Sequence, residues 1–181
     1  MIEVDRAASG LTTVTMNRPR RRNALDSQAM ADLRDAFIEA GQDADLRCLI
    51  LQGAGGGFSA GRDLKQAADL NQAEALAQHA AWGEAFKALR RLPAPSVAVV
   101  QGAAVAGGFT LSVATDFMIA ERTAKFGALE MANGFPAAMC TPILAKKAAP
   151  RIGLELAMFG TLESAERLHA AGLINRLADG P

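Results

Sequence analysis

Hydrophobic and polar residues follow two different periods along the first part of this chain. Residues 11–16 (LTTVTM) are rich in β-branched side chains and predict a strand, which Pro19 ends. Asp26 then has the side chain of a helix N-cap, and Gly41 is typical of a helix end. Between them apolar residues recur at helical spacing, at Met30, Leu33 and Phe37. We therefore predict a strand followed by an amphipathic helix.

The same alternation continues to the end of the chain. Buried strands are predicted at 46–51, 97–100 and 116–120, and a short extended piece at 124–127. A long alanine-rich helix is predicted over 71–92, with apolar contacts from Leu76, Trp82, Phe86 and Leu89. A further helix is expected over 107–114, and later helical segments are interrupted by Pro142 and Pro150. Alternating strands and helices predict the α/β class with parallel pairing, in a single domain over residues 1–181.

Composition and charge narrow the classes of function. Half of the residues are hydrophobic, and 19 Lys and Arg balance 19 Asp and Glu. This balance argues against a nucleic-acid partner, which would normally require a basic patch. No apolar run reaches the ~18 residues of a membrane span, and residues 1–10 do not resemble a signal peptide. We therefore expect a cytoplasmic protein with no membrane partner.

The cysteines give no sign of a metal site. Cys48 and Cys140 are far apart in the sequence and lie in no CxxC or histidine-linked pattern. We expect two reduced, packed thiols and no bound metal.

Two glycine-rich turns follow predicted strands, and neither fits a nucleotide motif. Phe58 stands where a dinucleotide-binding motif would need its third glycine, and Gly108 stands where a P-loop would need lysine. Small residues at 59–61 and 106–108 would instead expose backbone N–H groups near helix starts. Two such turns could direct two N–H groups at one oxygen, as in an oxyanion hole. The alternative is two tight turns with close helix packing.

Five separate motifs of the chain resemble the enoyl-CoA hydratase/isomerase (crotonase) family, in that family's order. The first two are Val14-Thr15-Met16-Asn17-Arg18-Pro19 with Arg22-Asn23-Ala24-Leu25, and Phe58-Ser59-Ala60-Gly61-Arg62-Asp63-Leu64. The others are Gln101-Gly102-Ala103-Ala104-Val105-Ala106-Gly107-Gly108, Phe126-Gly127-Ala128-Leu129-Glu130 and Ala170-Ala171-Gly172-Leu173-Ile174-Asn175. Together they extend over residues 11–176.

The resemblance implies a fold and a substrate. The expected fold is a crotonase-like spiral of ββα turns with two roughly perpendicular sheets, and a C-terminal helical region that is shortened or absent here. The substrate would be an acyl-CoA, so that coenzyme A arrives with the substrate and no separate cofactor is needed. Self-association as a trimer or hexamer is also implied.

The resemblance also assigns residues to the site. The backbone N–H groups of Ala60 and Gly107 would bind the thioester oxygen, and Glu130 would be the catalytic carboxylate. Contacts to the acyl-CoA are assigned to Arg22, Ala24, Leu25, Asp63, Leu64, Gly108 and Thr110. The basic run from Arg18 to Arg22 would pair with the phosphates of CoA, unless it is only a solvated loop.

One departure from the family bears on the reaction. Many hydratases of this family use two glutamates, and the first of them would fall at Thr110, which cannot accept a proton. One carboxylate is sufficient to move a proton between two carbons, so an isomerase is favoured over a hydratase. A hydratase in which Thr110 holds the water, and a non-catalytic acyl-CoA-binding relative, remain as alternatives.

Overall fold

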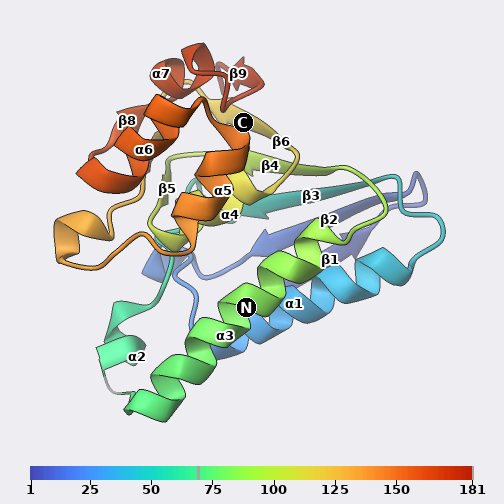
Figure 1. The fold of residues 1–181 in the computed structure, drawn as a ribbon. Coiled ribbons are helices and arrows are strands. Elements are labelled where there is room, and N and C mark those ends of the chain that lie inside the picture. The colour runs from blue at the N-terminus through green and yellow to red at the C-terminus, as the bar shows by residue number, and fades with distance from the viewer. Residues whose placement is uncertain (69, 181) are drawn as a thin grey trace.

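The computed structural model of the protein describes residues 1–68 and 70–180. The strands are β1 (Ile2–Arg6), β2 (Leu11–Met16), β3 (Cys48–Gly53), β4 (Ser96–Val100), β5 (Ala103–Val105), β6 (Phe117–Glu121), β7 (Lys125–Gly127), β8 (Glu163–Ser164) and β9 (Arg176–Ala178). The helices are α1 (Ser27–Gln42), α2 (Leu64–Ala68), α3 (Gln72–Arg90), α4 (Gly107–Ala114), α5 (Cys140–Lys147), α6 (Pro150–Phe159) and α7 (Ala165–Ala170). Short 3-10 helices occupy Pro19–Arg21 and Met131–Asn133. Figure 1 shows the arrangement of these elements.

The strands form two sheets, which confirms the predicted α/β class. The larger sheet has the order β1-β2-β3-β4-β6-β9, and every pair after β1-β2 is parallel. The smaller sheet has the order β5-β7-β8. Strands β4 and β5 are consecutive but lie in different sheets, so the chain crosses between them immediately before α4. This crossing brings the start of α4 to the junction of the two sheets.

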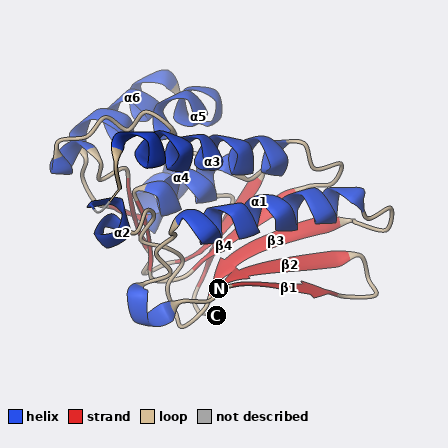
Figure 2. Ribbon diagram, turned by 90° about the horizontal axis from the view of Figure 1, so that it is seen from below, coloured by secondary structure: helices blue, strands red, loops and turns tan. Residues whose placement is uncertain are grey.

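Helices α1 and α3 lie side by side along one face of the larger sheet (Figure 2). Asp26 caps α1 as predicted, since its side chain accepts a hydrogen bond from Ala29 N at 2.9 Å. Asn71 and Glu74 form a reciprocal capping box at the start of α3. Trp82 and Leu89 are each 3% exposed, as expected for core contacts. The prediction for Leu76 was wrong: its side chain is 71% exposed, because this turn of α3 extends beyond the core.

Other sequence predictions differ from the structure mainly at boundaries. Strand β3 lies two residues later than expected, at Cys48–Gly53. Strand β1 was not predicted because its charged residues leave it largely exposed at the sheet edge. Pro142 does not interrupt a helix but lies in the first turn of α5, where the missing N–H is not needed. Among the described residues, no helix has the length and apolar character needed to cross a bilayer.

Candidate active site

The segment around Asn23 is built to hold a neighbouring turn. Asn23 has a positive φ of 53° and is 1% exposed. Its side-chain amide donates to Ala54 O at 2.9 Å and to Gly57 O at 2.7 Å, and its Oδ1 accepts from Arg18 N at 2.8 Å. These bonds tie the loop after β2 to the glycine cluster after β3.

A short parallel bridge continues this contact. Leu25 N donates to Gly61 O at 2.8 Å, and Asp63 N donates to Leu25 O at 2.9 Å. Arg62 lies between these two bonds, so its own N–H and C=O point away from Leu25. Gly61 N donates to Ser59 Oγ at 3.0 Å, which fixes the tight turn before Arg62.

The start of α4 supplies a second turn. Ala106 precedes the helix with φ 49° and ψ −126°, a backbone conformation that residues with a Cβ rarely adopt. Its N–H donates to Gly127 O at 2.8 Å, which anchors the turn to the smaller sheet. Gly107 is the first residue of α4, where a backbone N–H has no partner within the helix.

The two turns touch at Gly61 and Gly107. A Cβ on Gly61 would lie 2.5 Å from Gly107 N, and a Cβ on Gly108 would lie 2.2 Å from Ser59 O. A Cβ on Gly107 would lie 2.4 Å from the Cη2 atom of Trp82. Only glycine fits at these three positions, because the two backbones and one indole ring occupy the space that a side chain would need.

The prediction that Ala60 supplies a free N–H is contradicted. Ala60 N donates to Arg22 O at 2.9 Å, within the contact between the 22–25 segment and the turn. By contrast, the N–H groups of Arg62 and Gly107 donate to no acceptor among the described residues. Arg62 follows directly on Gly61, whose backbone touches Gly107, so the amides of Arg62 and Gly107 lie close together. Sequence reasoning missed Arg62 because the motif alone does not reveal which amides the bridge uses.

Glu130 follows β7 and precedes a 3-10 helix. Its Oε2 is buried and has no hydrogen-bond partner among the described residues. Burial raises the pKa of the Glu130 carboxyl, while a bond from its own backbone N–H and the charge of Arg62 act in the opposite direction. The carboxyl is therefore placed to take up and release a proton nearer to neutral pH than an ordinary glutamate.

Thr110 lies in α4, one helical turn after Ala106, and is 1% exposed. Its hydroxyl donates to Ala106 O at 3.2 Å. Burial raises the pKa of the Cys140 thiol to about 12; the charge of Glu130 also raises this pKa, whereas the Thr110 hydroxyl lowers it. Thr110, Cys140 and Glu130 therefore lie in one neighbourhood, and Cys140 is a member that the sequence did not suggest.

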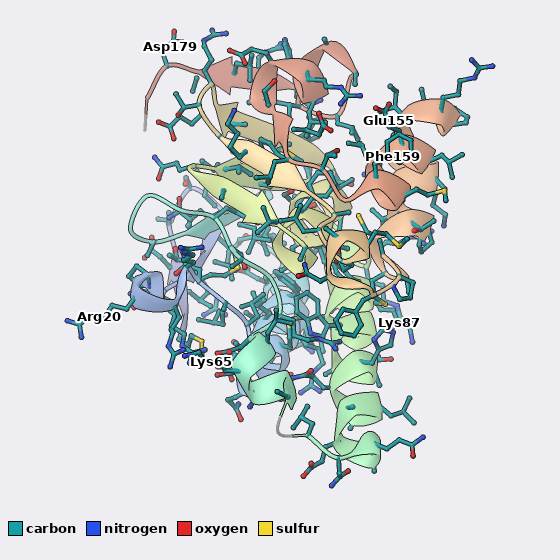
Figure 3. All side chains as sticks on the ribbon, turned by 90° about the vertical axis from the view of Figure 1, so that its left-hand side faces the viewer. Arg20, Lys65, Lys87, Glu155, Phe159 and Asp179 are labelled. Carbon is teal, nitrogen blue, oxygen red and sulfur yellow. The ribbon has the colours of Figure 1, made fainter. Side chains whose placement is uncertain are left out.

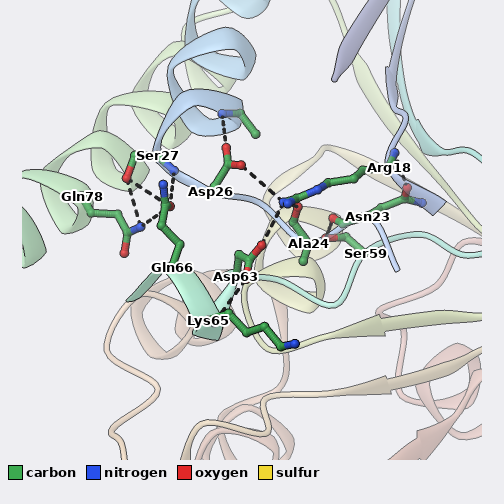
Figure 4. Close-up of polar contacts among 11 residues, drawn as sticks. Arg18, Asn23, Ala24, Asp26, Ser27, Ser59, Asp63, Lys65, Gln66 and Gln78 are labelled. Carbon is green, nitrogen blue, oxygen red and sulfur yellow. Dashed lines mark hydrogen bonds and ion pairs between the residues drawn. The ribbon is translucent and has the colours of Figure 1, made fainter. Parts of the chain in front are cut away.

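Of the other residues predicted to contact the acyl-CoA, some are buried inside the protein and others are accessible at its surface. Asp63 is 8% exposed and accepts a hydrogen bond from Arg18 Nη1 at 2.9 Å, so its side chain is held in an internal ion pair (Figure 4). Arg18 also contacts Asp26 at 3.3 Å, so two carboxylates share its charge. Leu25 is 1% exposed and packs in the core, whereas Leu64 is 63% exposed at the start of α2.

The exposed part of the basic run lies beside this region. Arg20, Arg21 and Arg22 are all exposed, and the Arg20 side chain extends away from the body of the protein (Figure 3). Ala24 is half-buried, and its C=O accepts a hydrogen bond from Arg18 Nη1 at 3.4 Å. Within the described part of the chain, no group of three or more His, Cys, Asp or Glu side chains could hold a metal ion.

Comparisons with known proteins identify the family of this chain. The enoyl-CoA hydratase/isomerase family matches residues 6–179. The chain is 33% identical over 179 residues to the 1,2-epoxyphenylacetyl-CoA isomerase of Escherichia coli K12, covering 94% of this chain and 67% of that protein. It is 42% identical over 120 residues to the enoyl-CoA hydratase EchA19 of Mycobacterium tuberculosis, covering 65% of this chain and 45% of that protein.

A solved structure of an enoyl-CoA hydratase from Mycobacterium smegmatis has the same fold. It superposes with a TM-score of 0.93 at 31% identity, covering 98% of this chain and 69% of that one. Several curated relatives match more than nine-tenths of this chain. The chain spans 63–71% of the length of these relatives. The match over residues 6–179 nevertheless includes both glycine turns and Glu130, and the chain belongs to the enoyl-CoA hydratase/isomerase family.

Proposed function

We propose that this protein is an acyl-CoA enzyme that stabilises the enolate of a thioester. The observation that carries the proposal is a pair of amides, Arg62 N–H and Gly107 N–H, which have no acceptor among the described residues and lie on two turns that touch at Gly61. Removing a proton beside a thioester carbonyl places negative charge on the carbonyl oxygen. Two preorganised donors stabilise that charge, each by roughly 3–4 kcal/mol in comparable sites.

Glu130 is the proposed acid and base. Its buried Oε2, which has no partner in the described part of the chain, and its raised pKa support a role in proton transfer. In this scheme Glu130 removes a proton from one carbon of the acyl group, the two amides hold the enolate, and Glu130 returns the proton to another carbon. No water molecule is needed for this sequence of steps.

Isomerisation of an enoyl-CoA is favoured over hydration. Thr110 stands where a second carboxylate would be needed, and its hydroxyl already donates to Ala106 O. It can still accept a hydrogen bond from water but cannot take the water's proton at neutral pH. Hydration therefore requires Glu130 to do both tasks, whereas isomerisation needs only one carboxylate.

The CoA part of the substrate is proposed to lie along the loop from Arg20 to Ala24. Arg20, Arg21 and Arg22 are exposed cations suited to phosphate, whereas Arg18 is engaged by Asp26 and Asp63. Leu25 uses its N–H and C=O in the bridge to Gly61 and Asp63, and the Asp63 side chain is held by Arg18, so we propose that these two residues position the loop. A cytoplasmic location and assembly into a trimer or hexamer also remain proposals.

The test is turnover of two substrates by the purified protein. Crotonyl-CoA reports hydration and 3-pentenoyl-CoA reports a shift of the double bond. We expect the protein to convert 3-pentenoyl-CoA faster, and Glu130→Gln to lower kcat by roughly a hundredfold or more while binding of CoA is retained. Absence of turnover with both substrates, with acyl-CoA still bound, would favour a non-catalytic binding protein.

A further inference from the structure

The guanidinium of Arg62 is a half-buried cation without a partner among the described residues. None of its N–H groups donates a hydrogen bond to these residues, and it forms no ion pair with any of their carboxylates within 4.0 Å. Burial lowers the pKa of Arg62, and the charge of Glu130 partly opposes this. A half-buried cation loses part of its hydration, and an anion that also accepts hydrogen bonds compensates this loss, so the position favours a ligand group that supplies both.

Two other polar atoms near this point also lack partners. Trp82 is 3% exposed, and its Nε1 donates no hydrogen bond to the described residues, although the other edge of its ring packs on Gly107. Oε2 of Glu130 is likewise buried and unpaired within the described chain. Three groups without partners among the described residues are therefore associated with the two turns: the Arg62 guanidinium, Nε1 of the Trp82 ring that packs on Gly107, and Oε2 of Glu130, whose charge acts on Arg62. A catalytic role accounts for the Glu130 carboxyl, but an acyl pocket for a plain hydrocarbon chain would not need the two donors.

The location of Arg62 separates it from the arginines of the proposed CoA loop. Its backbone N–H is one of the two proposed donors to the thioester oxygen, and its side-chain charge interacts with Glu130. Arg20 and Arg21 are instead exposed, on the 3-10 helix Pro19–Arg21. The Arg62 side chain is thus associated with the acyl end of the substrate.

We propose that the acyl group of the substrate carries a carboxylate and that Arg62 binds this carboxylate. The substrate class would be the CoA monothioester of a dicarboxylic acid, and this proposal rests on the proposed function. Guanidinium and carboxylate match in a planar, bidentate geometry, and each such charge-assisted bond is stronger than a neutral one. The substrate anion would also restore neutrality beside Arg62 when Glu130 is protonated during turnover.

The experiment measures binding by calorimetry with unreactive saturated thioesters of matched chain length. The pairs are glutaryl-CoA with pentanoyl-CoA and succinyl-CoA with butyryl-CoA. We expect the protein to bind the dicarboxylic member of at least one pair roughly tenfold to a hundredfold more tightly. Arg62→Met should remove this preference and Arg62→Lys should retain part of it. Arg34→Met, which changes a partly exposed arginine on α1, should leave the preference unchanged.

Two results would overturn the proposal. One is equal or tighter binding of the apolar member of both pairs by the unmodified protein, which requires no variant to fold. The other is an equal loss of affinity for free CoA and for all four thioesters in Arg62→Met, which would show that Arg62 binds a phosphate. Failure of the proposed function is distinguishable, because the binding preference would then persist while the protein converts neither 3-pentenoyl-CoA nor the CoA monothioester of 3-hexenedioic acid, which carries the carboxylate.

Discussion

The indole ring of Trp82 lies directly on the backbone of Gly107. A Cβ at position 107 would be 2.4 Å from Cη2 and 2.7 Å from Cζ3 of that ring, well inside van der Waals contact. Trp82 in turn packs against Phe86, with ring centroids 6.1 Å apart. The ring therefore excludes any side chain at the residue whose N–H is a proposed oxyanion donor.

Gly107→Ala is expected to damage both stability and catalysis. The added methyl group must displace Trp82 or the first turn of α4, which costs roughly 1–3 kcal/mol of unfolding free energy. The same displacement moves the Gly107 N–H, so kcat should fall by roughly a hundredfold. Thermal melting and steady-state kinetics measure the two effects.

Gly83→Ala is the matched control, because a Cβ at Gly83 in α3 meets nothing within 4 Å. Replacing a helical glycine with alanine should stabilise the protein by up to about 1 kcal/mol and leave turnover unchanged. If Gly107→Ala behaves like Gly83→Ala, Trp82 does not constrain the donor.

Ala106→Gly should stabilise the protein. The φ of 49° and ψ of −126° at Ala106 are strained for alanine, and relieving such strain is worth roughly 1–3 kcal/mol. The added freedom of glycine in the unfolded chain removes about 0.5–1 kcal/mol of that gain. Chemical denaturation should therefore give a higher unfolding free energy. Ala80→Gly, on the exposed face of α3, should instead lower it by about 1 kcal/mol.

Glu130→Gln should alter how stability depends on pH. Burial raises the pKa of the folded-state carboxyl above the ordinary value of 4.5. The folded protein then binds more protons than the unfolded chain, so the unfolding free energy falls as pH rises from 4.5 through the folded-state pKa. Glutamine does not ionise, so the unfolding free energy of the variant does not fall in this way. Its melting temperature should exceed that of the unmodified protein at about pH 8 but not at about pH 4.

Glu166→Gln, an exposed position in the first turn of α7, provides the comparison for that pH series. The melting temperature of Glu166→Gln should match that of the unmodified protein from about pH 4 to about pH 8. A Glu130→Gln melting curve that also follows it at both pH values would show that burial does not perturb the Glu130 carboxyl.

Thr110→Glu should increase hydration of crotonyl-CoA by about tenfold or more, because it supplies the second carboxylate that water activation needs. The variant also buries a second acid close to Glu130 and Cys140, so the melting temperature should fall. Thr110→Gln has nearly the same size without the charge and should not hydrate. If the unmodified protein already hydrates crotonyl-CoA efficiently and shifts no double bonds, the preference for isomerisation is wrong.

The sequence was sufficient for those parts of the fold that depend on local pattern. The helix at Gly107–Ala114, the Asp26 cap and the position of β2 agree with the structure because period and capping chemistry determine them. The family motif predicts Ala60 as the donor, but the sequence does not show which amides the bridge between Leu25 and Arg62 uses and which it leaves free, so it could not identify Arg62. The pairing of Arg18 with Asp63 depends on a contact across 45 residues, so a basic run alone could not reveal it.

Transfer of a solvent hydrogen to the acyl group tests the central claim most directly. The unmodified protein and Glu130→Gln are incubated with 3-butenoyl-CoA in D2O, and deuterium in the recovered thioester is measured by mass spectrometry. Proton removal at Cα, with the enolate stabilised by the Arg62 and Gly107 amides, predicts crotonyl-CoA formation with the unmodified protein and almost none with the variant. Deuterium enters the thioester to the extent that the proton held by Glu130 exchanges with D2O before it is returned. Formation of neither crotonyl-CoA nor deuterated thioester by the unmodified protein, or equal formation of both products by the two proteins, would contradict an enolate formed by Glu130.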